Sequence, residues 1–364
     1  MSSRVLFIGK KFISNPSGGR EMLSSLTYLS LKQILNDHCF HYEIDANKTN
    51  LSIVDALRSI FQGQIDGITL SITKSIIKKI KEKRISVIFL DGSNLGYLAK
   101  EIKKNIPNIK IICFFHNVES KFFLDSFLRV KSIRSLGVLW VNFLAERNAV
   151  KASDHIITLT NHDSKTLQRI YRKSSNAVIP IALEDKFKLT DHIEETNNPD
   201  RYILFVGGVF YANEYGIRWF IKNVSENIEF KTYVIGNGFD NFRSEFEGFR
   251  NVKVIGRVDE LNSWYQGADF VIAPIFNGSG MKTKVAEALM YGKKIVATKA
   301  ALIGYDSIPA ESYFLCNTKE EFIRVFRSLY DKKSNKFEEA LRKTYKKEFS
   351  PEAFKFKLAK ILKE

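Results

Sequence analysis

Residues 273–289 combine small side chains, two lysines and a glutamate in an order that suits phosphate binding. A buried strand is predicted to end at Ala273, and a helix is predicted to begin near Thr283. The free N–H groups at the start of such a helix and the helix dipole both favour an anion. Lys282 or Lys284 could add a positive charge beside it. The segment therefore predicts a phosphate site.

Glu287 lies about one turn inside the same predicted helix, where its carboxylate can face back towards the loop. A carboxylate in that place could accept hydrogen bonds from both hydroxyl groups of a ribose. Together the loop and Glu287 would fit a nucleoside diphosphate. The same spacing also fits an ordinary strand–loop–helix connection whose glycines only permit a tight turn, so the motif alone leaves both interpretations open.

The segment Gly278–Gly292, GSGMKTKVAEALMYG, resembles the donor-binding signature of retaining glycosyltransferases with the GT-B fold, particularly family 4 and its relatives. Further motifs agree with that family in order: Phe205–Gly208, Val234–Gly238, Val254–Val258 and Gly267–Asp269. The resemblance covers essentially the whole second half of the chain. It implies an α/β protein with two Rossmann-like doubly wound domains facing each other across a cleft.

The resemblance also implies roles for individual residues. In that family the base is held by backbone groups just after an Ile-Gly pair, here Arg257 and Val258, and the ribose by the glutamate that is here Glu287. The residues expected to bind the donor are Gly18, Gly19, Gly207, Gly208, Arg257, Val258, Gly278, Ser279, Gly280, Met281, Lys282, Lys284 and Glu287.

Two positions depart from the family pattern. Many members carry an acidic residue eight positions before the glutamate, where this chain has Ser279. Many also place a basic residue just after the first glycine of the second domain, where this chain has Gly208, Val209 and Phe210. The diphosphate charge would then fall to Lys282 or Lys284.

The first half is similar to the same family, with less specific motifs. Gly18 and Gly19 follow the first strand and precede a helix, where glycines let backbone approach a ligand, although they could equally only shape the turn. His116 is predicted at the carboxyl end of a buried strand, at the edge where α/β sheets bind ligands. His116 and Asn117 are expected to contact the acceptor, and His116, Lys284 and Glu287 to act in catalysis.

The reaction implied by the resemblance is transfer of a sugar from a UDP- or GDP-sugar to a hydroxyl group with retention at the anomeric carbon. No cofactor and no metal are expected, since N–H groups of Gly280 and Met281 and the lysines would stabilise the leaving diphosphate. The acceptor is expected to be a saccharide or a lipid-linked saccharide of cell-surface polysaccharide synthesis.

Short β-branched runs alternate with amphipathic stretches along most of the chain, which favours parallel sheets. Strands are predicted at Val5–Ile8, Val87–Leu90, Ile109–Phe115, His155–Leu159, Ala177–Ile179, Tyr202–Val206, Phe230–Ile235, Val252–Ile255, Phe270–Ala273 and Lys294–Ala297. Helices are predicted at Glu21–Leu35, Ile72–Lys83, Gly96–Lys104 and Ser164–Tyr171 and from Pro351 onwards.

The polar stretch Leu183–Asp200 contains no predicted strand and predicts a linker. We therefore expect an acceptor-binding domain over residues 1–185 and a nucleotide-sugar-binding domain over residues 186–349. A terminal helix over residues 350–364 is expected to cross back to the first domain, as is usual for this fold.

The composition is that of a folded globular protein, with 45% hydrophobic and 26% charged residues among 364. Cys39, Cys113 and Cys316 form no metal or redox motif. The apolar run near residue 5 is too short for a secretory signal, and no segment approaches the roughly 20 apolar residues of a membrane span. We expect a cytoplasmic protein.

The formal net charge of +16 favours a polyanion, an anionic membrane or a phosphorylated substrate as partner, although a lysine-rich hydrated surface would also explain it. Residues 122–150 mix aromatic and aliphatic side chains with Arg129, Lys131 and Arg134. An interfacial helix would look like this, and so would a helix packed on a sheet. We expect peripheral contact with the inner face of the cell membrane.

Other functions stay open. A sugar-nucleotide epimerase or a phosphorylase could use the same fold, and a catalytically silent partner subunit would explain Ser279. A basic, non-catalytic binding protein would explain the charge, but no nucleic-acid motif is present, so no specific nucleic-acid partner is expected.

Overall fold

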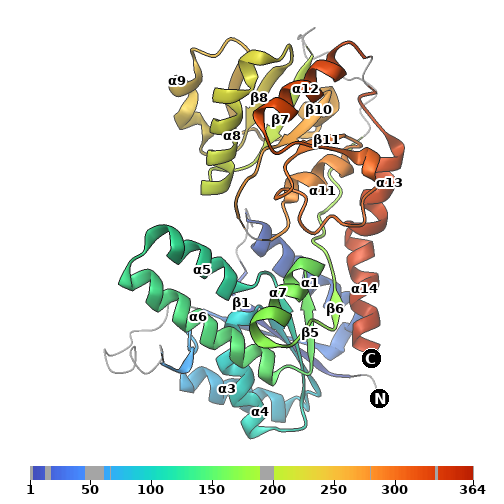
Figure 1. The fold of residues 1–364 in the computed structure, drawn as a ribbon. Coiled ribbons are helices and arrows are strands. Elements are labelled where there is room, and N and C mark those ends of the chain that lie inside the picture. The colour runs from blue at the N-terminus through green and yellow to red at the C-terminus, as the bar shows by residue number, and fades with distance from the viewer. Residues whose placement is uncertain are drawn as a thin grey trace. The chain divides into compact units, whose positions relative to one another are not determined.

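The chain forms two α/β units in a computed structural model that describes residues 3–12, 18–45, 61–65, 67–188, 201–278, 280–332 and 335–363 (Figure 1). Unit 1 comprises Met1–Ile181 together with Phe354–Glu364, and unit 2 comprises Ala182–Ala353. Each unit is built around its own parallel sheet.

Unit 1 contains a six-stranded sheet in the order β2-β1-β3-β4-β5-β6. Its strands are β1 (Val5–Lys10), β2 (Cys39–Ile44), β3 (Val87–Asp91), β4 (Lys110–Phe115), β5 (His155–Thr158) and β6 (Ala177–Val178). Successive residues of the central strands are buried, for example Leu6, Phe7 and Ile8 of β1, because helices cover both faces of a parallel sheet. In the register of β1 and β3, Leu6 lies opposite Ile88.

The helices of unit 1 are α1 (Gly19–Leu35), α3 (Leu70–Glu82), α4 (Gly96–Asn105), α5 (Glu119–Val130), α6 (Ile133–Ala152), α7 (Asn161–Tyr171) and the end of α14 (Pro351–Lys363). Helix α14 buries Phe354, Leu358 and Ile361. The ring of Phe354 lies 6.1 Å from that of Phe114 on β4, so this late helix contributes to the core of unit 1.

Unit 2 contains a second six-stranded parallel sheet in the order β12-β11-β10-β7-β8-β9. Its strands are β7 (Tyr202–Val206), β8 (Lys231–Ile235), β9 (Val252–Gly256), β10 (Phe270–Ala273), β11 (Ile295–Ala297) and β12 (Tyr313–Leu315). Its helices are α8 (Tyr211–Asn223), α9 (Arg243–Phe246), α10 (Asn262–Gly267), α11 (Thr283–Met290), α12 (Lys319–Tyr330) and α13 (Glu339–Glu348). The strand order is that of a Rossmann fold, and it reverses between β7 and β10.

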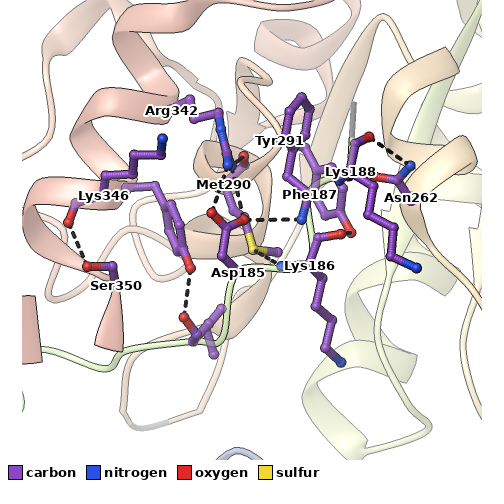
Figure 2. A network of polar contacts seen from close by, with 12 residues as sticks. Asp185, Lys186, Phe187, Lys188, Asn262, Met290, Tyr291, Arg342, Lys346 and Ser350 are labelled. Carbon is purple, nitrogen blue, oxygen red and sulfur yellow. Dashed lines mark hydrogen bonds and ion pairs between the residues drawn. The ribbon is translucent and has the colours of Figure 1, made fainter. Parts of the chain in front are cut away.

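The described start of the predicted linker is bound to unit 2 (Figure 2). Arg342 of α13 contacts both carboxylate oxygens of Asp185, at 3.1 and 2.7 Å, and donates to the carbonyl of Met290 at 2.7 Å. The backbone of Lys188 exchanges two hydrogen bonds with the side chain of Asn262. The guanidinium of Arg342 also lies 4.1 Å from the ring centre of Phe187. Residues 183–188 are therefore an ordered part of unit 2.

Three features differ from the sequence-based expectations. Strand β2 was missed because, in CFHYEI, only Ile44 is fully buried, as suits the edge of a sheet. Strand β12, the short edge strand of the second sheet, was missed as well, and none of its three residues is fully buried. The apolar stretch expected as one helix over residues 122–150 is instead two helices. The chain turns at Lys131, whose φ of 49° is left-handed, and Ser132 caps α6 by accepting from the N–H of Ser135.

Helices α4 and α6 approach closely at Gly96. A Cβ atom at Gly96 would lie 1.8 Å from the carbonyl oxygen of Ala145 and 2.5 Å from the backbone nitrogen of Ala149. Gly137, on α6, has nothing within 4 Å of such an atom. The packing of the two helices therefore requires glycine at position 96, whereas position 137 has room for a larger residue.

We predict that Gly96→Ala lowers the free energy of unfolding by about 1–3 kcal/mol, because the helices must separate. Gly137→Ala, the matched control, should raise it by roughly 0.4–1 kcal/mol, because alanine restricts the unfolded chain. Denaturant unfolding followed by circular dichroism measures both. Equal effects of the two substitutions would contradict the close packing of α4 on α6.

Candidate functional site

The predicted donor residues of unit 2 follow the strands at which the sheet order reverses. Gly207 and Gly208 come after β7, and the segment Gly278–Lys284 leads from β10 into α11. Because all the strands are parallel, these loops meet at the carboxyl edge of the sheet, where α/β folds bind ligands. The structure thereby brings these two predicted groups of residues together.

A side chain at Gly207 or Gly236, beside the start of the loop after β7, would meet other atoms at short distances. A Cβ atom at Gly236, after β8, would lie 1.8 Å from the carbonyl oxygen of Gly207. A Cβ atom at Gly207 would itself lie 3.1 Å from Nζ of Lys284 and 2.9 Å from Nδ2 of Asn213. Glycine at both positions lets the strand ends, a lysine and an asparagine converge.

Lys284, in the first turn of α11, is 4% exposed. Its Nζ donates to Oδ1 of Asn213 at 2.7 Å and lies 4.1 Å from the ring centre of Phe205. Burial lowers the pKa of Lys284 to about 7, with a smaller contribution from Lys282 and an opposing one from Glu287. A buried cation at this edge would be stabilised by an anion.

Lys282 has a different environment from Lys284. Its Nζ donates to the carbonyl oxygens of Gly278, at 3.2 Å, and Gly280, at 2.7 Å, and so closes the loop on itself. Gly278 and Gly280 have φ values of 106° and 71°, which favour glycine. Met281 is buried, whereas the predicted Ser279 lies outside the described residues.

Glu287 is held by aromatic side chains. Its Oε2 accepts a hydrogen bond of 2.9 Å from the hydroxyl of Tyr265, and the ring of Tyr265 stacks on that of Tyr291 at 4.3 Å. Burial raises the pKa of Glu287, against the lowering effects of Tyr265, Lys284 and Lys186. The second carboxylate oxygen has no hydrogen bond among the described residues and suits a donor such as a sugar hydroxyl.

Arg257 and Val258 follow β9, the edge strand of the same sheet. Gly256, just before them, has a φ of 84° and lies so close to Asp240 that a Cβ atom would be 1.8 Å from Oδ1. Arg243 donates to Asp240 at 3.2 Å. Glycine is thus favoured just before Arg257 and Val258, and Arg257 is exposed.

The predicted residues of unit 1 also lie at the carboxyl edge of its sheet. Gly18 is the N-cap of α1, and Gly19 begins that helix. His116 and Asn117 follow β4. His116 Nε2 lies 3.0 Å from Oδ1 of Asp91, at the end of the neighbouring β3, and both side chains are buried. Although burial acts to raise it, the charge of His116 lowers the pKa of Asp91.

The loop that carries His116 is anchored by Glu146 of α6. The N-cap residue of α5, Val118, has no side chain that can cap the helix, and the carboxylate of Glu146 takes that place. It accepts from the backbone N–H groups of Glu119, at 2.8 Å, and Ser120, at 3.1 Å, and from the hydroxyl of Tyr171 at 2.9 Å. Nδ1 of His116 has no hydrogen-bond partner among the described residues.

Sequence reasoning missed Asn213, Tyr265 and Asp91. Each lies far along the chain from the predicted residue that it contacts, so no local spacing announces the pair. Asp91 alone carried a signal, because a charged residue ends an otherwise apolar strand. Among the described residues there is no group of three or more histidine, cysteine, aspartate or glutamate side chains that could hold a metal ion.

Comparison with known proteins gives one family and a consistent fold. Residues 200–332 match the family described as Glycosyl transferases group 1. No curated protein matches the chain.

Solved structures resemble the chain over both units. Sucrose-phosphate synthase from Thermosynechococcus elongatus is 13% identical, with a TM-score of 0.73 over 99% of this chain and 98% of that one. Anabaena HepE in complex with UDP is 11% identical, with a TM-score of 0.69 over 99% of each chain. WaaG, a glycosyltransferase involved in lipopolysaccharide biosynthesis, is 14% identical, with a TM-score of 0.62 over 98% of this chain and 99% of that one.

The family match falls on the unit in which Lys284 and Glu287 meet at the reversal of strand order, and the structural matches extend the fold to unit 1. The protein is an enzyme, a glycosyltransferase of the GT-B fold whose residues 200–332 match the group 1 glycosyltransferase family.

Proposed function

We propose that the protein transfers a sugar from a UDP- or GDP-sugar to a hydroxyl group of a saccharide or lipid-linked saccharide, with retention and without a metal. One observation supports this most directly: the start of α11, the buried Lys284 and the partly free carboxylate of Glu287 lie together in unit 2. A diphosphate would lie by the first two and a ribose by the third. The UDP complex of HepE supports a nucleotide in this fold.

In the proposed reaction, the bond between the anomeric carbon and the leaving phosphate oxygen breaks as the acceptor oxygen attacks. Negative charge collects on the departing diphosphate, and the N–H groups at the start of α11 and the lysine ammonium stabilise it more than the intact donor. The leaving phosphate oxygen takes the proton of the acceptor hydroxyl. This chemistry supports retention without a carboxylate that acts as general base.

Unit 1 is proposed to supply the acceptor side. His116, held by Asp91, and Asn117 would contact the acceptor or the transferred sugar, with Gly18 and Gly19 allowing close approach of backbone. The role of His116 is supported by its Nδ1, which is buried without a hydrogen-bond partner among the described residues and which a sugar hydroxyl would satisfy.

The acceptor is proposed to be reached at a membrane surface. Helices α5 and α6 pack on each other (Figure 1) and expose apolar side chains at their connection: Leu124, Leu128, Val130, Ile133, Leu136, Val138 and Trp140. Ile133 is 92% exposed. Arg129, Lys131 and Arg134 lie among them, and residues 126–145 contain no acidic residue. Apolar side chains ringed by basic ones suit an anionic bilayer surface. No described helix has the length and apolar character to span a bilayer.

We predict that Glu287→Gln weakens nucleoside diphosphate binding about 10- to 100-fold, the effect of losing a hydrogen bond to a charged acceptor. A thermal-shift panel of UDP-, GDP- and dTDP-sugars first identifies the base, and titration calorimetry then gives Kd. Glu339→Gln, which removes an exposed carboxylate of the same unit, is the matched control.

The ribose contact can be isolated with the 2′-deoxy form of the nucleotide that binds. The wild-type protein should bind the deoxy ligand more weakly than the ribose form. Glu287→Gln, which already lacks the contact, should bind the two forms with nearly equal affinity. Additive losses would place the ribose elsewhere.

Metal independence is testable on binding alone. We predict that the Kd for the preferred nucleotide-sugar changes less than about twofold between EDTA and millimolar Mg²⁺ or Mn²⁺, because fixed N–H groups and a lysine supply the charge. Donor binding that appears only with a divalent cation would contradict the proposal.

We predict that the protein floats with vesicles containing anionic lipid at low salt and not with neutral vesicles. The double substitution Ile133→Ser and Leu136→Ser should reduce flotation at least about tenfold, since each buried side chain contributes roughly 1.5–3 kcal/mol. Leu29→Ser, a half-exposed leucine of α1, serves as control. Equal flotation of both variants would contradict the proposal that α5 and α6 form the membrane contact.

A further inference from the structure

Two buried lysines of unit 2 have contrasting surroundings. Lys293 donates to the carbonyl oxygens of Gln266 and Ala268, both at 2.8 Å, and also to that of Lys336. Three acceptors satisfy the three N–H bonds of its ammonium group. Lys293 therefore has a structural role.

Lys284 is equally buried, but among the described residues Oδ1 of Asn213 is its one hydrogen-bond acceptor. The face of the Phe205 ring covers another side of the ammonium group. Two N–H bonds thus have no hydrogen-bond acceptor among the described residues. A buried ammonium with unused donors, at the edge where the strand order reverses, is prepared for an anion.

Asn213 is fixed in the orientation that serves Lys284. It lies in the first turn of α8, and its Nδ2 donates to the carbonyl oxygen of Gly208 at 2.8 Å. That bond turns Oδ1 towards Lys284. The side chain thereby joins the loop after β7 to the start of α11, and Gly207 has no Cβ that would displace either group.

We propose that Asn213 is a positioning residue that holds the ammonium of Lys284 in place for the diphosphate of the donor. The proposal rests on the proposed function, because it takes a nucleoside diphosphate as the ligand. Asn213 itself need not touch the substrate. It acts by fixing the direction in which the ammonium of Lys284 points.

A measurable consequence is proton uptake on binding. The pKa of Lys284 is lowered to about 7 by burial, and a bound diphosphate raises it again. The surrounding titratable groups are Glu287 and Lys282, with Tyr265, Tyr305 and Lys186 around Glu287 and the loop. Burial raises the pKa of both tyrosines, so they stay neutral, and at about pH 8.5 the diphosphate is fully ionised since its last pKa is about 6.

The experiment is calorimetric titration of the wild-type protein with UDP and with GDP, in Tris and in HEPES, whose heats of ionisation differ. At about pH 8.5 we expect uptake of nearly one proton per nucleotide bound, and an affinity that falls about tenfold for each pH unit above 8. Lys284→Met should bind more weakly, without proton uptake and without this pH dependence.

Two variants test Asn213 itself. Asn213→Ala should weaken nucleotide binding about tenfold while proton uptake persists, because the cation is present but misplaced. Asn213→Asp should abolish uptake, because the introduced carboxylate keeps Lys284 charged in the free protein. Asn223→Ala is the matched control: this asparagine of α8 also donates to a backbone carbonyl, that of Trp219 at 2.8 Å.

The outcomes are distinct. Wild-type affinity and wild-type uptake in Asn213→Ala would overturn the positioning role, as would equal weakening in Asn223→Ala. Nucleotide binding without proton uptake in the wild-type protein would overturn the assignment of Lys284 as the diphosphate's cation. Failure of both UDP and GDP to bind would instead count against the proposed function.

Discussion

The candidate donor site depends on the burial of one lysine ammonium, that of Lys284, at the carboxyl edge of the unit 2 sheet. Removing a charge from water costs free energy unless partners compensate. Among the described residues, Lys284 is compensated by an amide oxygen, an aromatic face and the charge of Glu287. Glycines at positions 207 and 236 are required because side chains there would occupy the space of that cation or of the loop beside it. The ammonium of Lys284 thus has enough partners to be buried, and it keeps N–H bonds that an anion could accept.

Unit 1 also buries a charged side chain, the carboxylate of Glu146. Helix α5 begins at a residue that cannot cap it, and Glu146 supplies the cap from α6. The same carboxylate also accepts from the hydroxyl of Ser93 after β3 at 3.3 Å. The His116 loop is therefore fixed by a residue distant in sequence, and Asp91 lies 3.0 Å from Nε2 of the ring. In both units, the residues that face the ligand edge are positioned by partners from other elements.

Contacts between residues that are distant in sequence limited what could be predicted from the sequence. The α/β class, the positions of most strands and helices and the loop before α11 follow from local periodicity and from helix-start chemistry, so they could be predicted. The resemblance added residues such as Arg257, Val258 and Glu287, whose roles remain predictions. Asn213 could not be found, because it lies 71 residues before Lys284 and its importance arises only when two loops meet. Strand β2 was hidden for another reason, since an edge strand keeps polar residues that blur its pattern.

The two units differ in whether they are formed by one segment of the chain or by two. Unit 2 is one continuous stretch of chain, whereas unit 1 includes α14, whose Phe354, Leu358 and Ile361 enter its core. During synthesis the ribosome therefore releases all of unit 2 before it releases the segment that completes unit 1. Although its first strand is made earliest, unit 1 finishes folding last, and until then the apolar surface that α14 covers stays available to chaperones. In topological terms unit 2 is an insertion within unit 1, so unit 2 can be excised as one segment, whereas unit 1 cannot.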